Sequence, residues 1–123
     1  MAGPVKGLDA IWVHIRDIKK ARAFYKDALG LKELRYSEEQ EYGTYAIPGT
    51  KSYLGIHRQG KDEPGRRAGT VSGVYFKVAD VKKAAAVIAK KGWKITDKPE
   101  KMPWGDWNAT VADPDGNEFV ISN

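Results

Sequence analysis

The chain has 123 residues, of which 41% are hydrophobic, and this size and composition fit one domain with a sizeable core. It contains no cysteine, which excludes disulfide bonds, thiolate metal ligands and cysteine nucleophiles, and no apolar run approaches the roughly 20 residues of a membrane-spanning helix. The 21 Lys and Arg outnumber the 16 Asp and Glu and give the chain a net charge of +5. Because the basic residues are spread along the chain, on what we interpret as solvated helix faces, we do not expect a nucleic-acid partner, and we expect no membrane partner either.

The chain carries an internal repeat. The segment IRDIKKA at 15–21 recurs as VADVKKA at 78–84, and each copy follows an alternating apolar run and precedes a helical pattern. Asp17 and Asp80 stand where a helix N-cap belongs, because a carboxylate accepts hydrogen bonds from the free N–H groups of the first turn. Each half predicts a strand, a helix and three further strands. Within a single domain over 1–123, we place the first module at 8–58, a connection at 59–70 and the second module at 71–122.

Each predicted helix has one apolar stripe and ends at a glycine, a common helix stop. The first stripe precedes Gly30 and consists of Ile18, Ala21, Tyr25, Ala28 and Leu29. The second precedes Gly92 and consists of Val81, Ala84, Val87 and Ile88. Both stripes predict a helix that packs on a sheet.

The first and last strands of each module have two chemically different faces, because successive residues of a strand point to opposite sides. One face is aliphatic or Phe and suits packing under helices: Ile11, Val13, Ile15, Leu54, Ile56, Val74, Phe76, Val78, Phe119 and Ile121. If the four strands are neighbours, the other face forms a concave wall, lined by Trp12, His14, Tyr53, His57, Tyr75 and Glu118, with room left at Gly55 and Gly73. Such a wall suits a ligand cavity. A solvated face and a dimer interface are the alternatives.

Three segments carry a resemblance to a known family: the run from Asp17 through AFYKDALGL at 23–31, the tripeptide PWG at 103–105 and the turn DPDGN at 113–117. They resemble the vicinal oxygen chelate superfamily, which includes glyoxalase I, extradiol dioxygenases, fosfomycin resistance enzymes and bleomycin resistance proteins. The resemblance covers about residues 8–122. It implies an α+β fold in which paired βαβββ modules form an open, barrel-like mixed sheet with helices on the outside.

Metal-using members of that superfamily hold their metal with four ligands, typically a His early in the first strand and a Glu in the last strand of each module. By position, these fall on Ala10, Gly55, Gly73 and Val120 of this chain. None of these side chains can bind a metal ion, so we expect no metal and no other cofactor. His14, His57 and Glu118 are displaced from those positions by two or four residues. They form an alternative set, either for a displaced metal or for metal-free acid–base catalysis.

Resemblance and composition together predict metal-independent binding of a small molecule. Flat rings give a planar ligand a large contact area, and the expected ligand-binding residues are Trp12, His14, Tyr53, His57, Tyr75, Trp104, Trp107 and Glu118. The alternative is a glyoxalase-like lyase or another enzyme, with His14, His57 or Glu118 as catalytic residues. A third possibility is a structural or regulatory module whose open face a partner covers. By the same resemblance we expect a homodimer, and because the first residues lack the apolar segment of a secretory signal, a cytoplasmic protein.

Overall fold

The computed structural model describes residues 3–60 and 67–123, so part of the predicted connection, 61–66, lies outside the described residues. The first half of the chain contains β1 (Ala10–Ile15), α1 (Ile18–Ala23), the π-helical segment η1 (Phe24–Ala28), β2 (Lys32–Ser37), β3 (Tyr42–Ala46) and β4 (Tyr53–Arg58). The second half contains β5 (Val71–Lys77), α2 (Val81–Lys90), β6 (Lys94–Lys101), β7 (Trp107–Ala112) and β8 (Glu118–Ser122). Both halves therefore have the predicted order of a strand, a helical segment and three strands.

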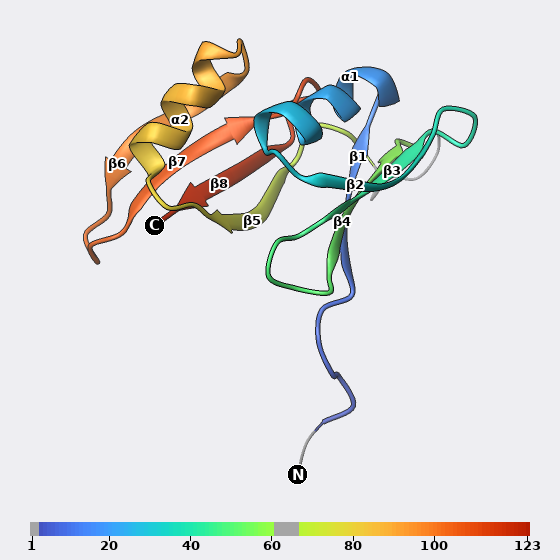
Figure 1. Cartoon of the computed structure of the whole chain (residues 1–123), viewed down its shortest axis with the longest axis horizontal. Helices are drawn as coiled ribbons and strands as arrows, with labels where there is room; N and C mark the ends of the chain where they lie inside the picture. Colours follow the sequence, from blue (N-terminus) through green and yellow to red (C-terminus); the bar gives the residue numbers. More distant parts are fainter. Residues whose placement is uncertain (1–2, 61–66) are drawn as a thin grey trace.

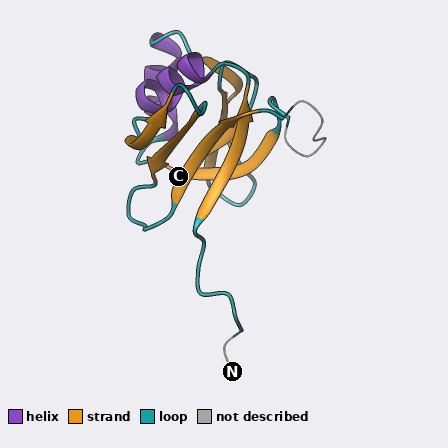
Figure 2. Ribbon diagram, turned by 90° about the vertical axis from the view of Figure 1, so that its right-hand side faces the viewer, coloured by secondary structure: helices purple, strands orange, loops and turns teal. Residues whose placement is uncertain are grey.

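The strands form two four-stranded mixed sheets, each built from one half of the chain (Figure 1). Sheet A has the order β1-β4-β3-β2, and sheet B has the order β5-β8-β7-β6. In each sheet the first and last strands of the half pair in parallel, and the other neighbours pair antiparallel. The helices gather on one side of the molecule (Figure 2). The fold is thus α+β, as predicted, and the described strands form two open sheets without a closed barrel.

Both helices begin at the predicted caps. The Asp17 carboxylate accepts hydrogen bonds from the backbone N–H groups of Lys19 and Lys20, and the Asp80 carboxylate accepts one from Lys83 N–H. Past the helix ends, Gly30 and Gly92 adopt φ angles of 65° and 94°, a region that favours glycine. Within the described residues, no helix has the length and apolar character needed to cross a membrane.

The first helix changes form before it reaches Leu29, unlike the continuous helix that its stripe predicts. From Phe24 onward it widens into the π-helical segment η1, where the Leu29 N–H donates to the Phe24 carbonyl five residues back. The wider turn places two successive rings, Phe24 and Tyr25, in the core with no exposed surface. Phe24 reaches the second half of the chain, with ring centroids 5.4 Å from Trp93 and 6.5 Å from Phe119.

One hydrophobic core joins the two halves. The predicted helix-facing residues of the parallel strands enter it, and those at most 5% exposed are Val13, Ile15, Leu54, Ile56, Phe119 and Ile121. On α2 the stripe is centred on Val81, Ala85 and Ile88. Val87, predicted to be part of this stripe, is instead 52% exposed, because it lies about 100° around the helix from Ile88.

Candidate functional site

A cavity of about 730 Å³ opens on the face of sheet B that points away from the core. We call this the open face of sheet B. Tyr75, Thr110 and Val120 project there, because each alternates along its strand with core residues on the opposite face. Strand β6 and the β6–β7 loop complete the wall, whose members are Tyr75, Thr96, Asp97, Lys98, Pro99, Glu100, Met102, Trp104, Asn108, Ala109, Thr110 and Val120.

Two aromatic side chains lie largely exposed at this cavity. Tyr75 is 62% exposed and Trp104 is 69% exposed. A tight turn holds Trp104 at the rim: the Gly105 N–H donates to the Met102 carbonyl over 2.9 Å, and Gly105 has a φ of 104°. Exposed apolar groups beside a hollow are typical of a surface that binds a ligand or a partner.

The polar groups of the cavity include one that the described residues leave unsatisfied. The side-chain Oδ1 of Asn108 is buried and has no hydrogen-bond partner, and buried polar atoms without a partner are rare in folded proteins. Nearby, β6 contributes two acidic residues, Asp97 and Glu100, against one basic residue, Lys98. The charge of this lining is therefore −1, opposite in sign to the +5 of the chain.

The corresponding face of sheet A is occupied by the chain's own side chains. The Trp12 ring lies across Gly55 and meets Tyr53 edge-on, with ring centroids 6.0 Å apart. A Cβ added at Gly55 would lie 2.4 Å from the Trp12 ring, so the space predicted at this glycine is taken up by that ring. At Gly73 an added Cβ would meet nothing within 4 Å, but its φ of 73° disfavours other residues.

The structure does not gather the predicted wall on one sheet. Strands β1 and β4 pair only within sheet A, and β5 and β8 only within sheet B. The predicted set is thereby divided, with Trp12, His14, Tyr53 and His57 on sheet A and Tyr75 and Glu118 on sheet B. Of the predicted ligand-binding residues, the cavity contains Tyr75 and Trp104. Trp107 lies on the opposite face of sheet B, where the Lys82 ammonium is 4.0 Å from the centre of its ring.

His14, His57 and Glu118 do not form a metal-ligand set. His14 and His57 are register partners in β1 and β4, and the His57 Nδ1 lies 2.8 Å from the Arg58 carbonyl oxygen, whereas Glu118 begins β8 in the other sheet. No three His, Cys, Asp or Glu side chains within 3–60 and 67–123 lie close enough together to hold a metal ion. The positions that the resemblance assigns to the family's ligands, Ala10, Gly55, Gly73 and Val120, have side chains without a metal donor. The described residues therefore do not fit the metal that the superfamily commonly uses, and we derive no step through one.

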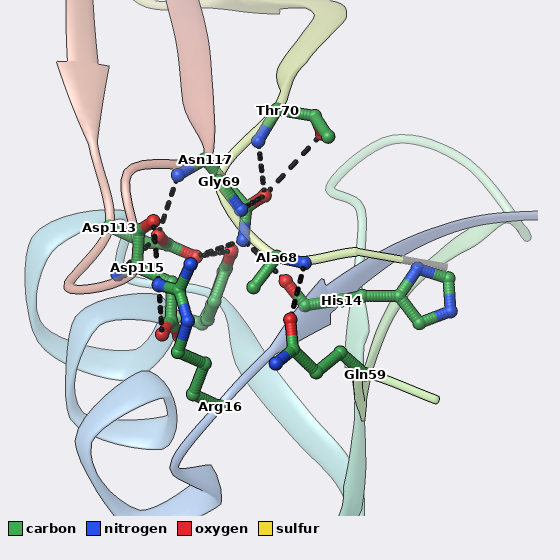
Figure 3. A network of polar contacts seen from close by, with 10 residues as sticks. His14, Arg16, Gln59, Ala68, Gly69, Thr70, Asp113, Asp115 and Asn117 are labelled. Carbon is green, nitrogen blue, oxygen red and sulfur yellow. Dashed lines mark hydrogen bonds and ion pairs between the residues drawn. The ribbon is translucent and has the colours of Figure 1, made fainter. Parts of the chain in front are cut away.

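The DPDGN turn, predicted to be structural, makes a polar network at the junction of the two halves (Figure 3). Asn117 is fully buried; its amide oxygen accepts from Gly69 and Thr70 N–H, and its amide nitrogen donates to the His14 carbonyl over 2.7 Å. The Tyr25 hydroxyl donates to Asp113 over 2.6 Å, and burial raises the pKa of Tyr25 well above its usual value, with the Asp113 carboxylate as the next cause. The His14 ring points away from this network, so the contact of His14 with it is through the backbone.

Several cavity residues were not predicted from the sequence. Thr96, Lys98, Glu100 and Met102 alternate along β6 and its end, yet β6 has no apolar alternation that would show which of its faces is inside. Its register with β7 also shifts twice, which a sequence pattern does not show. The sequence therefore did not predict that β6 lines the cavity, and the structure shows it.

Comparison with known proteins identifies the family. A sequence model of the Glyoxalase/Bleomycin resistance protein/Dioxygenase superfamily matches residues 7–121. The chain belongs to this superfamily. The predicted resemblance is confirmed, and a relative agrees with it: the uncharacterized protein YraH of Bacillus subtilis (strain 168) is 33% identical over 117 residues, covering 87% of this chain and 90% of YraH.

Solved structures with the same fold include proteins of different functions. A superfamily member from Sphaerobacter thermophilus DSM 20745 matches with a TM-score of 0.81 at 26% identity, covering 96% of this chain and 97% of that one. TnmS3, an antibiotic binding protein from Streptomyces sp. CB03234, matches at 0.81 and 24% identity, covering 98% and 97%. A lactoylglutathione lyase from Agrobacterium tumefaciens matches at 0.72 and 18% identity, covering 97% and 94%. The superfamily fold thus serves both binding and catalysis, and the function has to be argued from the site.

Proposed function

We propose that this chain binds a planar aromatic small molecule on the open face of sheet B, without a metal. The observation that carries the proposal is the cavity of about 730 Å³ with two largely exposed rings, those of Tyr75 and Trp104. Rings of this kind stack on flat ligands and supply large contact area at little conformational cost. The antibiotic-binding role of the structurally similar TnmS3 supports a binding function for the fold.

The polar groups of the cavity favour a ligand that donates hydrogen bonds or carries positive charge. The unsatisfied Oδ1 of Asn108 can accept a hydrogen bond from a ligand N–H or O–H group after a small rotation of its amide. Asp97 and Glu100 outnumber Lys98 and attract a cation, and Trp104 and Tyr75 add cation–π attraction. A planar cation with N–H donors therefore combines all three features.

We also propose that the protein acts as a homodimer. Sheet A presents Trp12, which is 44% exposed, and sheet B presents Tyr75 and Trp104. Covering these apolar groups with a second copy would remove them from water and enclose the ligand. Sedimentation of the purified chain checks this proposal: a mass of one chain at the concentrations used for binding contradicts it.

The binding proposal is tested by tryptophan fluorescence with a panel of planar tricyclic compounds, in cationic, neutral and anionic versions. We expect quenching by the cationic compounds first, and the substitution Trp104→Ala should weaken binding about tenfold through the lost stacking. Trp12→Ala is the matched control, since it removes an exposed ring from the other sheet. Binding that survives Trp104→Ala but is lost in Trp12→Ala would move the site to sheet A, and the absence of quenching by every compound of the panel would overturn the proposal.

A further inference from the structure

The side chains of the cavity on the open face of sheet B form rows across the sheet, because register partners on neighbouring strands point to the same face. One row takes a residue from each of β5, β8, β7 and β6 in turn: Tyr75, Val120, Thr110 and Asp97. In the next row, Asn108 and Glu100 are partners on β7 and β6. Figure 1 shows the four strands side by side. The cavity therefore spans the sheet, from an aromatic side chain on β5 to carboxylates on β6.

The two ends of these rows differ in charge. Strands β5 and β8 contribute only Tyr75 and Val120 to the cavity lining, whereas β6 contributes both of its carboxylates, Asp97 and Glu100. Both carboxylates are exposed, and within residues 3–60 and 67–123 neither forms an ion pair, even with Lys98 of the same strand. The lining is thus apolar and uncharged at one end and offers two unpaired negative charges at the other.

The distance between these ends constrains the shape of a ligand. Neighbouring strands lie about 4.8 Å apart, so Tyr75 on β5 and Asp97 on β6 are separated by three spacings, about 14 Å. A ring stacked on Tyr75 above Val120 is still about 10 Å, two spacings, from β6. Outside the lining, Lys77 and Glu118 flank this row on β5 and β8 with opposite charges. A positive charge within such a ring would gain little there, whereas a charge on an arm could reach β6.

We propose, on the basis of the proposed function, that the ligand is an aryl-alkylamine, a planar ring whose positive charge is on a flexible arm. The ring would stack on Tyr75, and the ammonium would lie between Asp97 and Glu100, which belong to rows about 7 Å apart. Asn108 Oδ1, in the same row as Glu100, would accept an ammonium N–H. The cavity of about 730 Å³ is in the upper half of the roughly 300–1,000 Å³ of small-molecule sites, so it has room for a ring and an arm.

Fluorescence titration of the full chain with naphthalimides tests this proposal. The imide nitrogen carries an arm of two, four or six methylenes that ends in either an ammonium or a methyl group. We expect the ammonium to add little affinity on the shortest arm and about fivefold or more on the longest, because only the longer arm reaches β6.

The outcomes of this titration separate the two proposals. If the ring binds but the ammonium adds nothing, or adds the same at every arm length, the charge is not held at a distance from the ring and the inference is overturned, while the proposed function stands. If none of the compounds binds, whatever its arm, the proposed function fails and the inference with it.

Substitutions that neutralise the carboxylates locate the ammonium. Asp97→Asn and Glu100→Gln should each reduce the preference for the ammonium over the methyl group about twofold, and the double variant should abolish it without changing the affinity for the methyl compound. Glu39→Gln is the matched control, because it makes the same chemical change as Glu100→Gln at an exposed residue of the β2–β3 turn. Circular dichroism confirms that each variant is folded. Equal losses in Glu100→Gln and Glu39→Gln would mean that only the overall charge matters, and they would contradict the proposed position of the ammonium.

Discussion

The two sheets of this protein share one strand order, but their outward faces differ. On sheet A, the Trp12 ring lies over Gly55 and fills the middle of the face. On sheet B, the corresponding region is a cavity with Tyr75 and Trp104 exposed around it. A repeated topology therefore does not dictate a repeated surface: on sheet A one large side chain takes up the space over one glycine.

The strand-connecting turns differ in the same way. In the β3–β4 turn of the first half, Thr50 Oγ1 donates to the Ile47 carbonyl and accepts from Ser52 N–H, and Ser52 Oγ donates to the Leu8 carbonyl, so these hydrogen bonds stay within the first half. In the β7–β8 turn of the second half, Asn117 and Asp113 bond to residues of both halves. The β7–β8 turn thus connects the two halves, and its half also contains the open cavity, whereas the hydrogen bonds described for the β3–β4 turn stay within the first half, whose outward face is occupied by Trp12.

The largest expected effect comes from breaking the turn that joins the halves. Asn117 has no exposed surface, and Asn117→Ala removes its side-chain hydrogen bonds to four groups: Gly69 N–H, Thr70 N–H, the His14 carbonyl and the Asp113 carboxylate. Since the substitution breaks several hydrogen bonds of one buried side chain at once and leaves a cavity there, the free energy of unfolding should fall by about 3–5 kcal/mol in denaturant titrations.

Thr50→Ala is the matched substitution in the other turn. Thr50 is exposed and its hydrogen bonds are local, so the loss should stay within about 0.5 kcal/mol. If the two variants were destabilised equally, the two turns would be equivalent and the contrast drawn between the halves would be wrong.

A smaller effect, dependent on pH, is expected from Tyr25→Phe. The substitution removes the hydroxyl that donates to Asp113, and at neutral pH it should cost about 2 kcal/mol. Because the folded state raises the pKa of Tyr25, its contribution to stability is fully present below the unfolded pKa of about 10 and is lost as pH rises toward the folded value. Unfolding curves at pH 7, 9, 10 and 11 should show a shallower alkaline loss in Tyr25→Phe than in the original chain. An unchanged alkaline slope would mean that Tyr25 does not titrate in this way.

Features set by local chemistry were predicted well. The alternation of Val13 with Trp12 and of Phe119 with Val120 separated core residues from outward ones, because a buried strand face accepts little but apolar side chains. Asp17 and Asp80 marked helix starts, because few residue types satisfy the first N–H groups of a helix.

Features set by distant contacts were not predicted. The expected wall needed four adjacent strands. The alternation of apolar and polar residues within a strand does not show whether that strand hydrogen-bonds to a strand of the other half. At the π-helical turn, Phe24 packs against Trp93 and Phe119, which are distant in the sequence. Asn117 was recognised as a turn residue, but its hydrogen bonds to residues about 48 and 103 positions away have no local signature.

Apart from the control Thr50→Ala, the smallest losses of stability are expected at Gly55 and Gly73, and they have different causes. Gly55→Ala should cost about 1–2 kcal/mol, because its Cβ would overlap the Trp12 ring and this half-exposed ring would have to swing away. Gly73→Ala should cost about 1 kcal/mol for a different reason: nothing lies near its Cβ, but its φ of 73° is unfavourable for alanine. Trp12→Ala, combined with each substitution in turn, distinguishes the two causes.

With the ring removed, Gly55→Ala should cost little, giving a coupling of about 1 kcal/mol between positions 12 and 55, while Gly73→Ala should cost the same in either background. Free energies of unfolding for the single and double variants measure both couplings. Additive effects at positions 12 and 55 would show that Gly55 does not hold the Trp12 ring in place. The ring would then not account for the closed face of sheet A, and the difference between the two sheets would need another cause.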